Sequence, residues 1–188
     1  MKLGVPMEPD GETRVAIAPS SMKKLMKAGF EVLVEKNAGK ASNYSDADYE
    51  SAGAKIVSRK EIMECDTIIS IRFPGIEGLS KGTRIACVAD PFRNPEHVKS
   101  CIDAGITLLS MDMIPRRLSR AQSMDVNSSQ DNLAGYKAVI EACSLFKKAF
   151  PMMMTAAGTI IPAKCLILGA GVAGLQAIAT AKRLGCVV

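Results

Sequence analysis

A glycine-rich turn between a short apolar run and an alanine-rich segment constrains the fold of this chain more than any other feature. Residues 165–168 are apolar, the glycines that follow have the spacing G-x-G-x-x-G, and residues 172–184 have the composition of a helix. Between a strand and a helix, this spacing is typical of dinucleotide-binding folds, because it permits a tight turn, a close approach of the backbone to a pyrophosphate and close helix packing. The helix N-terminus adds N–H groups that favour phosphate. The predicted cofactor-binding residues are Gly169, Gly171, Val172, Ala173 and Gly174.

The predicted dinucleotide site is incomplete within these residues. An NAD site of this type also needs an acidic residue about 20 residues beyond the glycines, at the end of the next strand, to hold the ribose hydroxyls. The sequence ends at Val188, inside that predicted strand. We therefore expect a fragment that holds only the opening βαβ of a Rossmann domain, and weak or undetectable binding of NADH by these residues alone. A tightly packed βα turn without a ligand is the alternative interpretation of the glycines.

The composition argues against several classes of function. A content of 48% hydrophobic and 23% charged residues is typical of a globular chain, and 188 residues suffice for one domain and a portion of a second. The net charge of +5 is spread along the chain, and only 4% of the residues are aromatic, so nucleic-acid binding is not expected. The chain begins directly with a predicted strand and has no apolar run of membrane-spanning length. We therefore expect a soluble polypeptide with no leader.

The cysteines are widely spaced. They form neither a C-x-x-C metal motif nor the framework of a disulfide-rich secreted domain, so we expect reduced, buried thiols and no metal. The six are Cys65, Cys87, Cys101, Cys143, Cys165 and Cys186.

Strand and helix patterns alternate over the first two thirds of the chain. Apolar and alternating runs predict strands at residues 2–6, 31–35, 55–57, 67–72, 84–88 and 107–110. Between them, helices are predicted at residues 19–28, 45–52, 61–64 and 95–104. This alternation predicts the α/β class, with a doubly wound, mostly parallel sheet that is covered by helices on both faces.

A polar segment at residues 115–127 interrupts this alternation and is predicted to be an exposed loop. Apolar residues then recur at spacings of three or four, which predicts a helix over residues 129–149 with its N-cap at Asn127 or Ser128. We place a domain boundary here, with an N-terminal α/β domain at 1–126, and with the linking helix and the partial NAD-binding Rossmann domain at 127–188. Residues 151–162 are expected to be a connecting loop whose methionines, Met152 to Met154, fill a core, with a soft rim on a ligand cleft as the alternative.

Several strings resemble a known family. They are P-R-R-L-S-R-A-Q-S-M-D, S-S-Q-D-N-L-A-G-Y-K-A-V-I, and the stretch from M-M-M-T-A-A-G-T-I-I-P through the glycine turn to A-K-R-L-G. They closely resemble the NAD(H)-binding domain I, or alpha subunit, of proton-translocating nicotinamide nucleotide transhydrogenase. The opening G-V-P-M-E-P-D-G-E-T-R-V-A-I-A-P is similar to the wider family that this enzyme shares with alanine dehydrogenase. The resemblance covers essentially the whole chain.

The resemblance implies direct hydride transfer from NADH, bound here, to NADP, bound on a separate domain III, coupled to proton passage through a membrane domain II. It also implies a homodimer and no metal. The expected location is cytoplasmic and peripheral on the inner face of a membrane, or the mitochondrial matrix if the protein comes from an organelle. The site residues that the resemblance implies are Arg117, Gln122, Asp125, Ser128 and Tyr136.

The chemistry of hydride transfer suits these residue types. Transfer between two nicotinamides releases no proton at the reacting carbon, so the site needs positioning groups rather than a general acid or base. The Gln122 amide can donate to and accept from a carboxamide or a ribose hydroxyl, while a pair of Arg117 and Asp125 can fix the loop geometry. A loop can also exclude water during transfer and reopen for exchange. The alternative interpretation is an ordinary solvated polar loop.

Two other functions remain open. In an alanine-dehydrogenase-like 2-oxo acid reductase, Arg14 and Arg72 occupy places where that enzyme holds the substrate carboxylate. Its catalytic His, however, aligns with Asp90, and the only histidine, His97, is expected on a helix surface. The two arginines can equally be structural, tying loops at the sheet edge. The third function is a catalytically inert fragment that dimerises or senses NAD.

Overall fold

The computed structural model describes all 188 residues, Met1–Val188, which form two units, Met1–Pro115 and Arg116–Val188. The boundary lies eleven residues before the predicted start of the second domain at 127. The polar segment that follows Pro115 belongs to the second unit because Arg116 pairs with Asp125 and Asp131, at and beyond the start of the next helix.

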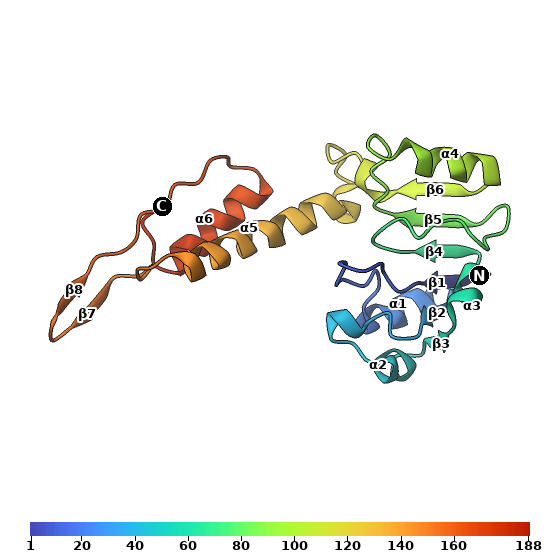
Figure 1. The fold of residues 1–188 in the computed structure, drawn as a ribbon, viewed down its shortest axis with the longest axis horizontal. Helices are drawn as coiled ribbons and strands as arrows, with labels where there is room; N and C mark the ends of the chain where they lie inside the picture. The colour runs from blue at the N-terminus through green and yellow to red at the C-terminus, as the bar shows by residue number, and fades with distance from the viewer. The chain divides into compact units, whose positions relative to one another are not determined.

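The first unit is built on a six-stranded sheet in which every pairing is parallel. Its order is β3-β2-β1-β4-β5-β6, so the direction in which strands are added reverses between β1 and β4 (Figure 1). The strands are β1 Lys2–Val5, β2 Glu31–Glu35, β3 Lys55–Val57, β4 Thr67–Ile69, β5 Arg84–Cys87 and β6 Thr107–Ser110. The helices are α1 Met22–Lys27, α2 Asp46–Ser51, α3 Arg59–Met63 and α4 Pro95–Ala104.

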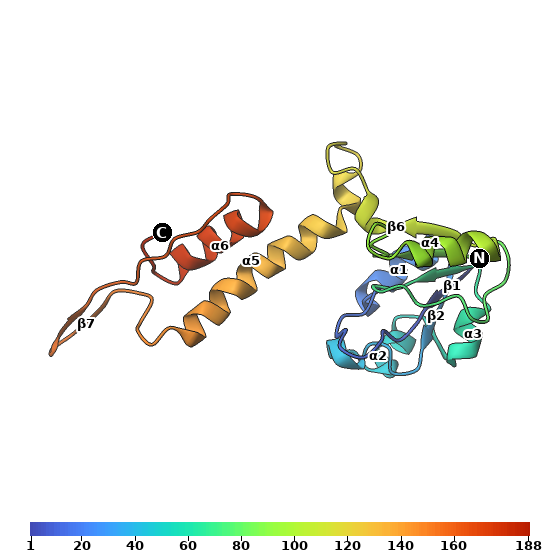
Figure 2. The ribbon, with the colours of Figure 1, turned by 45° about the horizontal axis from the view of Figure 1, so that its top comes forward.

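Apolar residues on alternate strand positions form a core on each face of this sheet. In β2, Val32 and Val34 pack into a cluster with Met22 of α1 and Tyr49 of α2, while Leu33 packs into the opposite cluster, which contains α3 and α4 residues. This is the period of two that an extended strand imposes. The predicted α/β class, with a parallel sheet covered on both faces, is confirmed. Figure 2 shows α4 alongside β6.

The second unit contains two helices that lie side by side, α5 Val126–Leu145 and α6 Val172–Arg183 (Figures 1 and 2). Between them, the chain forms an antiparallel hairpin of β7 Met153–Thr155 and β8 Gly158–Ile160. The hairpin replaces the expected connecting loop. Its residues are all exposed, as is Met152, so the expectation that the methionines fill a core is wrong: nothing in the chain packs over them.

The strand predicted at residues 165–168 is reduced to one parallel bridge between Lys164 and Val187. The Cys165 N–H donates to the Val187 carbonyl at 2.8 Å, and the Val187 N–H donates to the Ala163 carbonyl at 2.9 Å. Leu166 and Leu168, which follow this bridge, are 84% and 89% exposed.

None of the helices combines the length and the apolar character needed to cross a membrane.

Candidate functional site

The glycine turn has the geometry that its spacing requires. Gly169 has φ +104°, a conformation that residues with a Cβ rarely adopt. Gly171 has open space where a Cβ would lie, whereas a Cβ on Gly174 would overlap the carbonyl oxygen of Gly169. The Leu175 N–H donates to the Gly171 carbonyl at 2.8 Å and begins the hydrogen bonding of α6. The turn is therefore closed by backbone contact at its third glycine and open at its second.

The middle of α5 contacts this turn through a glycine that the sequence reasoning missed. A Cβ on Gly135 would overlap the backbone carbonyl of Ala173, in the first turn of α6. A glycine inside a helix costs about 1 kcal/mol relative to alanine, so its presence usually has a packing reason. That local signal was available in N-L-A-G-Y-K, but the contacting partner was not. Tyr136, one of the expected site residues, is half-exposed directly beside this contact.

Asp125 and Ser128 meet at the start of α5. Asp125 is the N-cap: its carboxylate accepts from the Ser128 N–H at 2.9 Å and from the Ser128 hydroxyl at 2.6 Å. These hydrogen bonds hold the pKa of the Asp125 carboxyl below its ordinary value. The cap thus lies two or three residues before the predicted Asn127 or Ser128, and α5 ends at Leu145, four residues before the predicted end.

The ion pair at this cap involves Arg116 rather than the expected Arg117. Arg116 Nε lies 3.6 Å from Asp125 Oδ2, and its Nη2 lies 3.6 Å from Asp131 Oδ2. Arg117 is exposed and makes no hydrogen bond or ion pair. The loop that precedes α5 is thus tied to the helix by the neighbouring arginine, a residue that the sequence reasoning passed over.

Gln122 lies on a short 3-10 turn, Gln122–Met124, and is exposed. The Asp125 N–H donates to its backbone carbonyl at 3.3 Å, which places the Gln122 turn directly before the cap. Ser128 in turn precedes Gly135 by two turns of α5, a rise of about 10 Å. One helix therefore connects the polar loop to the glycine turn.

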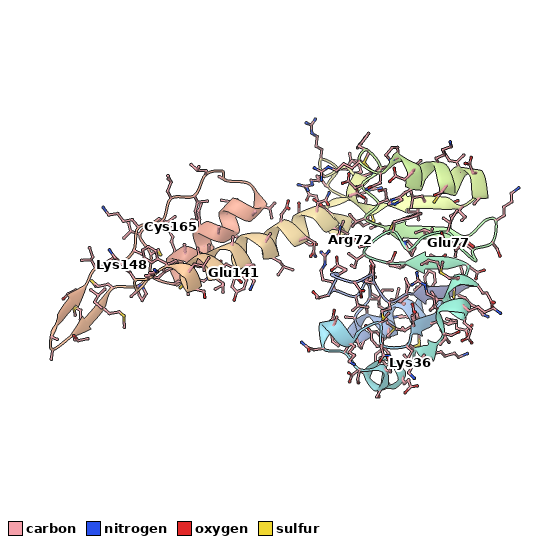
Figure 3. The ribbon with its side chains drawn as sticks, in the orientation of Figure 1. Lys36, Arg72, Glu77, Glu141, Lys148 and Cys165 are labelled. Atoms are coloured by element: carbon pink, nitrogen blue, oxygen red, sulfur yellow. The ribbon has the colours of Figure 1, made fainter.

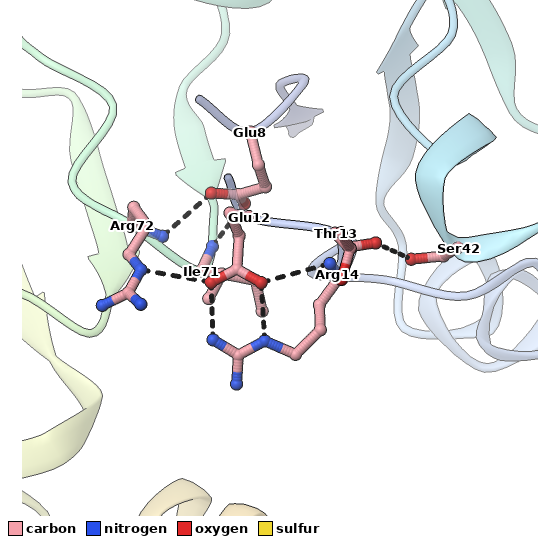
Figure 4. A network of polar contacts seen from close by, with 7 residues as sticks. All are labelled: Glu8, Glu12, Thr13, Arg14, Ser42, Ile71 and Arg72. Atoms are coloured by element: carbon pink, nitrogen blue, oxygen red, sulfur yellow. Dashed lines mark hydrogen bonds and ion pairs between the residues drawn. The ribbon is translucent and has the colours of Figure 1, made fainter. Parts of the chain in front are cut away.

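A second group of charged side chains lies at the carboxyl ends of β1 and β4, where Arg72 is labelled in Figure 3. The Glu12 carboxylate, 7% exposed, accepts from Arg14 Nε at 2.7 Å, from Arg14 Nη2 at 2.6 Å and from Arg72 Nε at 3.1 Å (Figure 4). The buried Glu8 carboxylate accepts from the backbone N–H groups of Ile71 at 2.5 Å and Arg72 at 2.9 Å. β4 ends at Ile69, short of the predicted residue 72, although the Ser70 N–H still donates to the Ala86 carbonyl at 3.1 Å and the Ile71 carbonyl accepts from the Val88 N–H at 3.0 Å. The two arginines thus converge on a carboxylate of their own chain.

We predict that acid weakens the first unit through Glu12. The hydrogen bonds from Arg14 lower the pKa of Glu12 to about 2, so its stabilising contribution is complete above pH 4.5 and is lost as the pH falls towards 2. Burial raises the pKa of Glu8, which acts in the opposite direction: its contribution is complete below pH 4.5 and is lost as the pH rises through the raised pKa. Urea unfolding should therefore show a larger stability difference between the unaltered chain and Glu12→Gln at pH 6 than at pH 3. A difference independent of pH contradicts the ion pair.

Asp90 and His97, the two residues considered for acid–base chemistry in a 2-oxo acid reductase, both contact other residues of the first unit. Asp90 has φ +44°, and its carbonyl accepts from the Asn94 side-chain amide at 3.2 Å. His97 is not the surface residue that was expected: it is half-buried and stacks on Phe73 at 4.2 Å between ring centroids, with Nδ1 buried and unpartnered. No hydrogen bond or ring contact joins His97 to Arg14 or Arg72.

Comparisons with known proteins match the whole chain. Models described as the N-terminal and C-terminal domains of alanine dehydrogenase/PNT match residues 4–134 and 138–188. A protein named NAD(P) transhydrogenase subunit alpha from Cereibacter sphaeroides is 42% identical over 100% of this chain and 37% of its own length. Alanine dehydrogenase from Bacillus subtilis is 26% identical over 98% of this chain and 50% of its own length. The chain thus spans half the length of these relatives or less.

A solved structure is similar to this chain in both sequence and fold. The crystal structure of transhydrogenase from Sinorhizobium meliloti is 46% identical, the match covers 99% of this chain and 57% of the solved chain, and the TM-score is 0.95.

Proposed function

The chain belongs to the alanine dehydrogenase/PNT family, and we propose that it is the NAD(H)-binding component of a transhydrogenase. In this proposal, NADH bound at the glycine turn gives hydride directly to NADP bound on a partner domain. Support comes from the higher identity to the transhydrogenase relative, 42% against 26% for an alanine dehydrogenase. Further support is Asp90, which offers no imidazole where a 2-oxo acid reductase needs a proton donor.

The glycine turn fits a dinucleotide. A Cβ at Gly171 would project into open space, which is the room that a pyrophosphate needs, and no side chain caps the N-terminus of α6 there. The N–H groups of Val172, Ala173 and Gly174 are the first three of that helix, and such groups favour phosphate oxygens. The residues that would hold the coenzyme therefore include these three, together with Gly169 and Gly171. When bound, NADH supplies the hydride.

The polar loop before α5 positions the nicotinamide. Asp125 and Ser128 fix the start of α5 through their mutual hydrogen bonds, and Arg116 ties the preceding loop to that start. Gln122 is held just before this cap with an exposed amide, which can both donate and accept. We assign Gln122 to orient the nicotinamide, Arg117 and Tyr136 to line its approach, and the Asp125–Ser128 pair to hold the loop. No proton moves in this step, so none of these groups acts as an acid or base.

The substitution Gln122→Asn tests the role of the loop. Shortening the amide by one methylene should slow single-turnover hydride transfer in the complete gene product by tenfold or more, about 1.4 kcal/mol in barrier, with little change in NADH affinity. Stopped-flow absorbance with an NADP-loaded partner domain measures the rate. Ser123→Ala, on the same 3-10 turn, is the matched control and should leave it unchanged. An unaltered rate for Gln122→Asn removes that residue from the site.

Two enzyme functions are separated by their acceptor. The complete gene product is supplied with NADH and either an NADP-loaded partner domain or pyruvate with ammonium. Oxidation of NADH in the first mixture alone is expected. Oxidation by pyruvate without the partner domain would instead assign a 2-oxo acid reductase. Calorimetry of residues 1–188 with NADH addresses the inert-fragment alternative: weak or undetectable binding is expected, and micromolar affinity contradicts that expectation.

We further propose a homodimer that acts at the inner face of a membrane through the partner domains. The hairpin supports the dimer, because an isolated exposed hairpin with apolar side chains is only marginally stable in water. Replacing Met154 and Ile161, both strongly exposed, by glutamate should convert a dimer into a monomer in sedimentation equilibrium. Ile102→Glu, an equally exposed position on α4, should not. A monomer before any substitution contradicts the dimer.

A further inference from the structure

Three thiols gather in the second unit. Cys143 of α5, together with Cys165 and Cys186, which adjoin the Lys164–Val187 bridge, packs into one core between α5 and α6. The cysteines were expected to be buried, but Cys143 and Cys165 are only partly buried, whereas Cys186 is 8% exposed. The cluster therefore contains a thiol that reaches the surface and a thiol that lies beneath it.

The Cys143 thiol lines an open hollow of about 510 Å³ near the C-terminal ends of α5 and α6. Two cationic side chains, Lys148 and Arg183, line the same hollow, and neither makes an ion pair. Gly185 forms another portion of the wall and directly precedes Cys186 in the chain. A molecule in this hollow thus meets one thiol, two cations and the segment that covers a second thiol.

The surroundings of this hollow carry positive charge. Residues 142–188 contain five lysines and arginines and no aspartate or glutamate. The acid just before this stretch, Glu141, is already paired with Lys137 at 2.5 Å. Figure 3 labels Glu141, Lys148 and Cys165 in this part of the second unit. Unpaired cations attract an anionic molecule over about 10 Å at ordinary salt concentrations, so the hollow favours a negatively charged reagent.

The register of the bridge limits which thiols can be joined. Because Lys164 lies opposite Val187 in a parallel pairing, Cys165 and Cys186 face the same side but stand two positions apart along the strands. With a rise of about 3.3 Å per residue and a strand spacing of about 4.8 Å, their Cα atoms lie about 8 Å apart, beyond the reach of a disulfide. Cys143 comes from a helix and is not held by this register.

We propose that Cys143 and Cys186 form a dithiol switch that reacts with anionic small-molecule disulfides of the glutathione type. In the first step, the Cys143 sulfur gives its proton to water and attacks one sulfur of the disulfide. The new bond joins Cys143 to that sulfur, the original S–S bond breaks, and the other half leaves as a thiolate that takes up a proton. In the second step, the Cys186 sulfur, which loses its proton to water, attacks the Cys143 sulfur, and the remaining half leaves as a thiol.

The two steps balance: the two cysteines lose two electrons, and one small disulfide becomes two thiols. Burial raises the pKa of the Cys186 thiol, so the second step should be slower than the first. The mixed disulfide at Cys143 should therefore accumulate and then decline. The internal disulfide would tie the end of α5 to the segment after α6 and, by closing that loop, raise the melting temperature of the oxidised protein.

The test exposes the reduced, complete gene product to glutathione disulfide or to cystamine, a cationic control. Mass spectrometry of peptides should show glutathione on Cys143 early and a Cys143–Cys186 disulfide later. In Cys186→Ser the glutathione should stay on Cys143, whereas Cys165→Ser should behave as the unaltered protein does. Replacing Lys148 and Arg183 together by glutamine should slow the reaction with glutathione disulfide, relative to cystamine, by about tenfold. Circular dichroism checks the folding of each variant.

Three results overturn the proposal. The first is a complete, unaltered gene product in which Cys143 stays unmodified, and this measurement needs no variant. The second is a mixed disulfide that lasts as long in the unaltered protein as in Cys186→Ser, because Cys186 would then not resolve it. The third is an unchanged preference for glutathione disulfide after both cations are removed. A failed NADP reaction would contradict the proposed hydride transfer but leave this inference in place.

Discussion

Gly174→Ala is expected to disrupt the glycine turn and weaken NADH binding by a hundredfold or more. The added Cβ would overlap the backbone carbonyl oxygen of Gly169, which no side-chain rotation can relieve. Either the turn opens or α6 shifts, and both displace the N–H groups that would hold the pyrophosphate. Overpacking typically costs 1–3 kcal/mol, and we expect about 3 kcal/mol here because the obstructing atom is backbone. Urea unfolding and calorimetry with NADH on the complete gene product measure the two effects.

Gly171→Ala is the matched control for this prediction. The backbone of Gly171 has φ −76°, which alanine adopts readily, and nothing lies within 4 Å of the added Cβ. Stability should therefore change by less than about 0.5 kcal/mol, while NADH affinity falls at least tenfold because the methyl group occupies ligand space. Comparing Gly174→Ala with Gly171→Ala separates an effect on the stability of the fold from an effect on NADH binding. Equal loss of stability in both variants, or full NADH affinity in Gly171→Ala, contradicts the proposed cradle.

Gly135→Ala should destabilise the second unit by about 3 kcal/mol. Alanine is the better helix former by about 1 kcal/mol, so an isolated α5 would gain from this change. In the folded unit, however, the new Cβ would overlap the Ala173 carbonyl, and α5 would have to move away from the glycine turn. Because the same contact positions the N-terminus of α6, NADH affinity should fall together with stability.

Thermal unfolding followed by far-ultraviolet circular dichroism measures this effect. Ala134→Ser, the preceding residue on α5, is exposed and should change stability by less than about 0.5 kcal/mol. If Gly135→Ala instead raises the melting temperature, helix propensity outweighs the contact, and α5 does not pack against the turn as closely as the structure has it.

The start of α5 illustrates how far local patterns reach. The sequence predicted a capped helix in this region, and its apolar spacing located the helix to within a few residues. Three residue types suited to capping, Asp125, Asn127 and Ser128, stand close together, and local preference alone does not select among them. The structure selects Asp125, whose carboxylate also faces Arg116. The family resemblance had pointed to Arg117 as the partner of Asp125, and the sequence contains no local signal that favours Arg116.

The hairpin and the missing strand at residues 165–168 show a second limit of prediction from sequence. Met153–Thr155 and Gly158–Ile160 pair with one another although their composition suggested a loop. Residues 165–168 have a strand composition, yet the pairing at this point is limited to a bridge at the preceding residue, Lys164. Strand formation depends on which segments lie alongside, so an apolar run predicts a capacity for pairing rather than the pairing itself.

The sequence by itself determined the alternation of strands and helices, the parallel α/β sheet and the glycine turn, because periodicity and turn chemistry act over a few residues. Only the tertiary structure decided which distant residues meet. Gly135 and Ala173 are 38 positions apart, and Glu12 and Arg72 are 60 apart. A charged or small side chain has many candidate partners along a chain, and the packing of whole elements selects one. For that reason the sequence left open whether Arg14 and Arg72 hold a substrate carboxylate or tie loops together, and only the fold pairs both of them with Glu12.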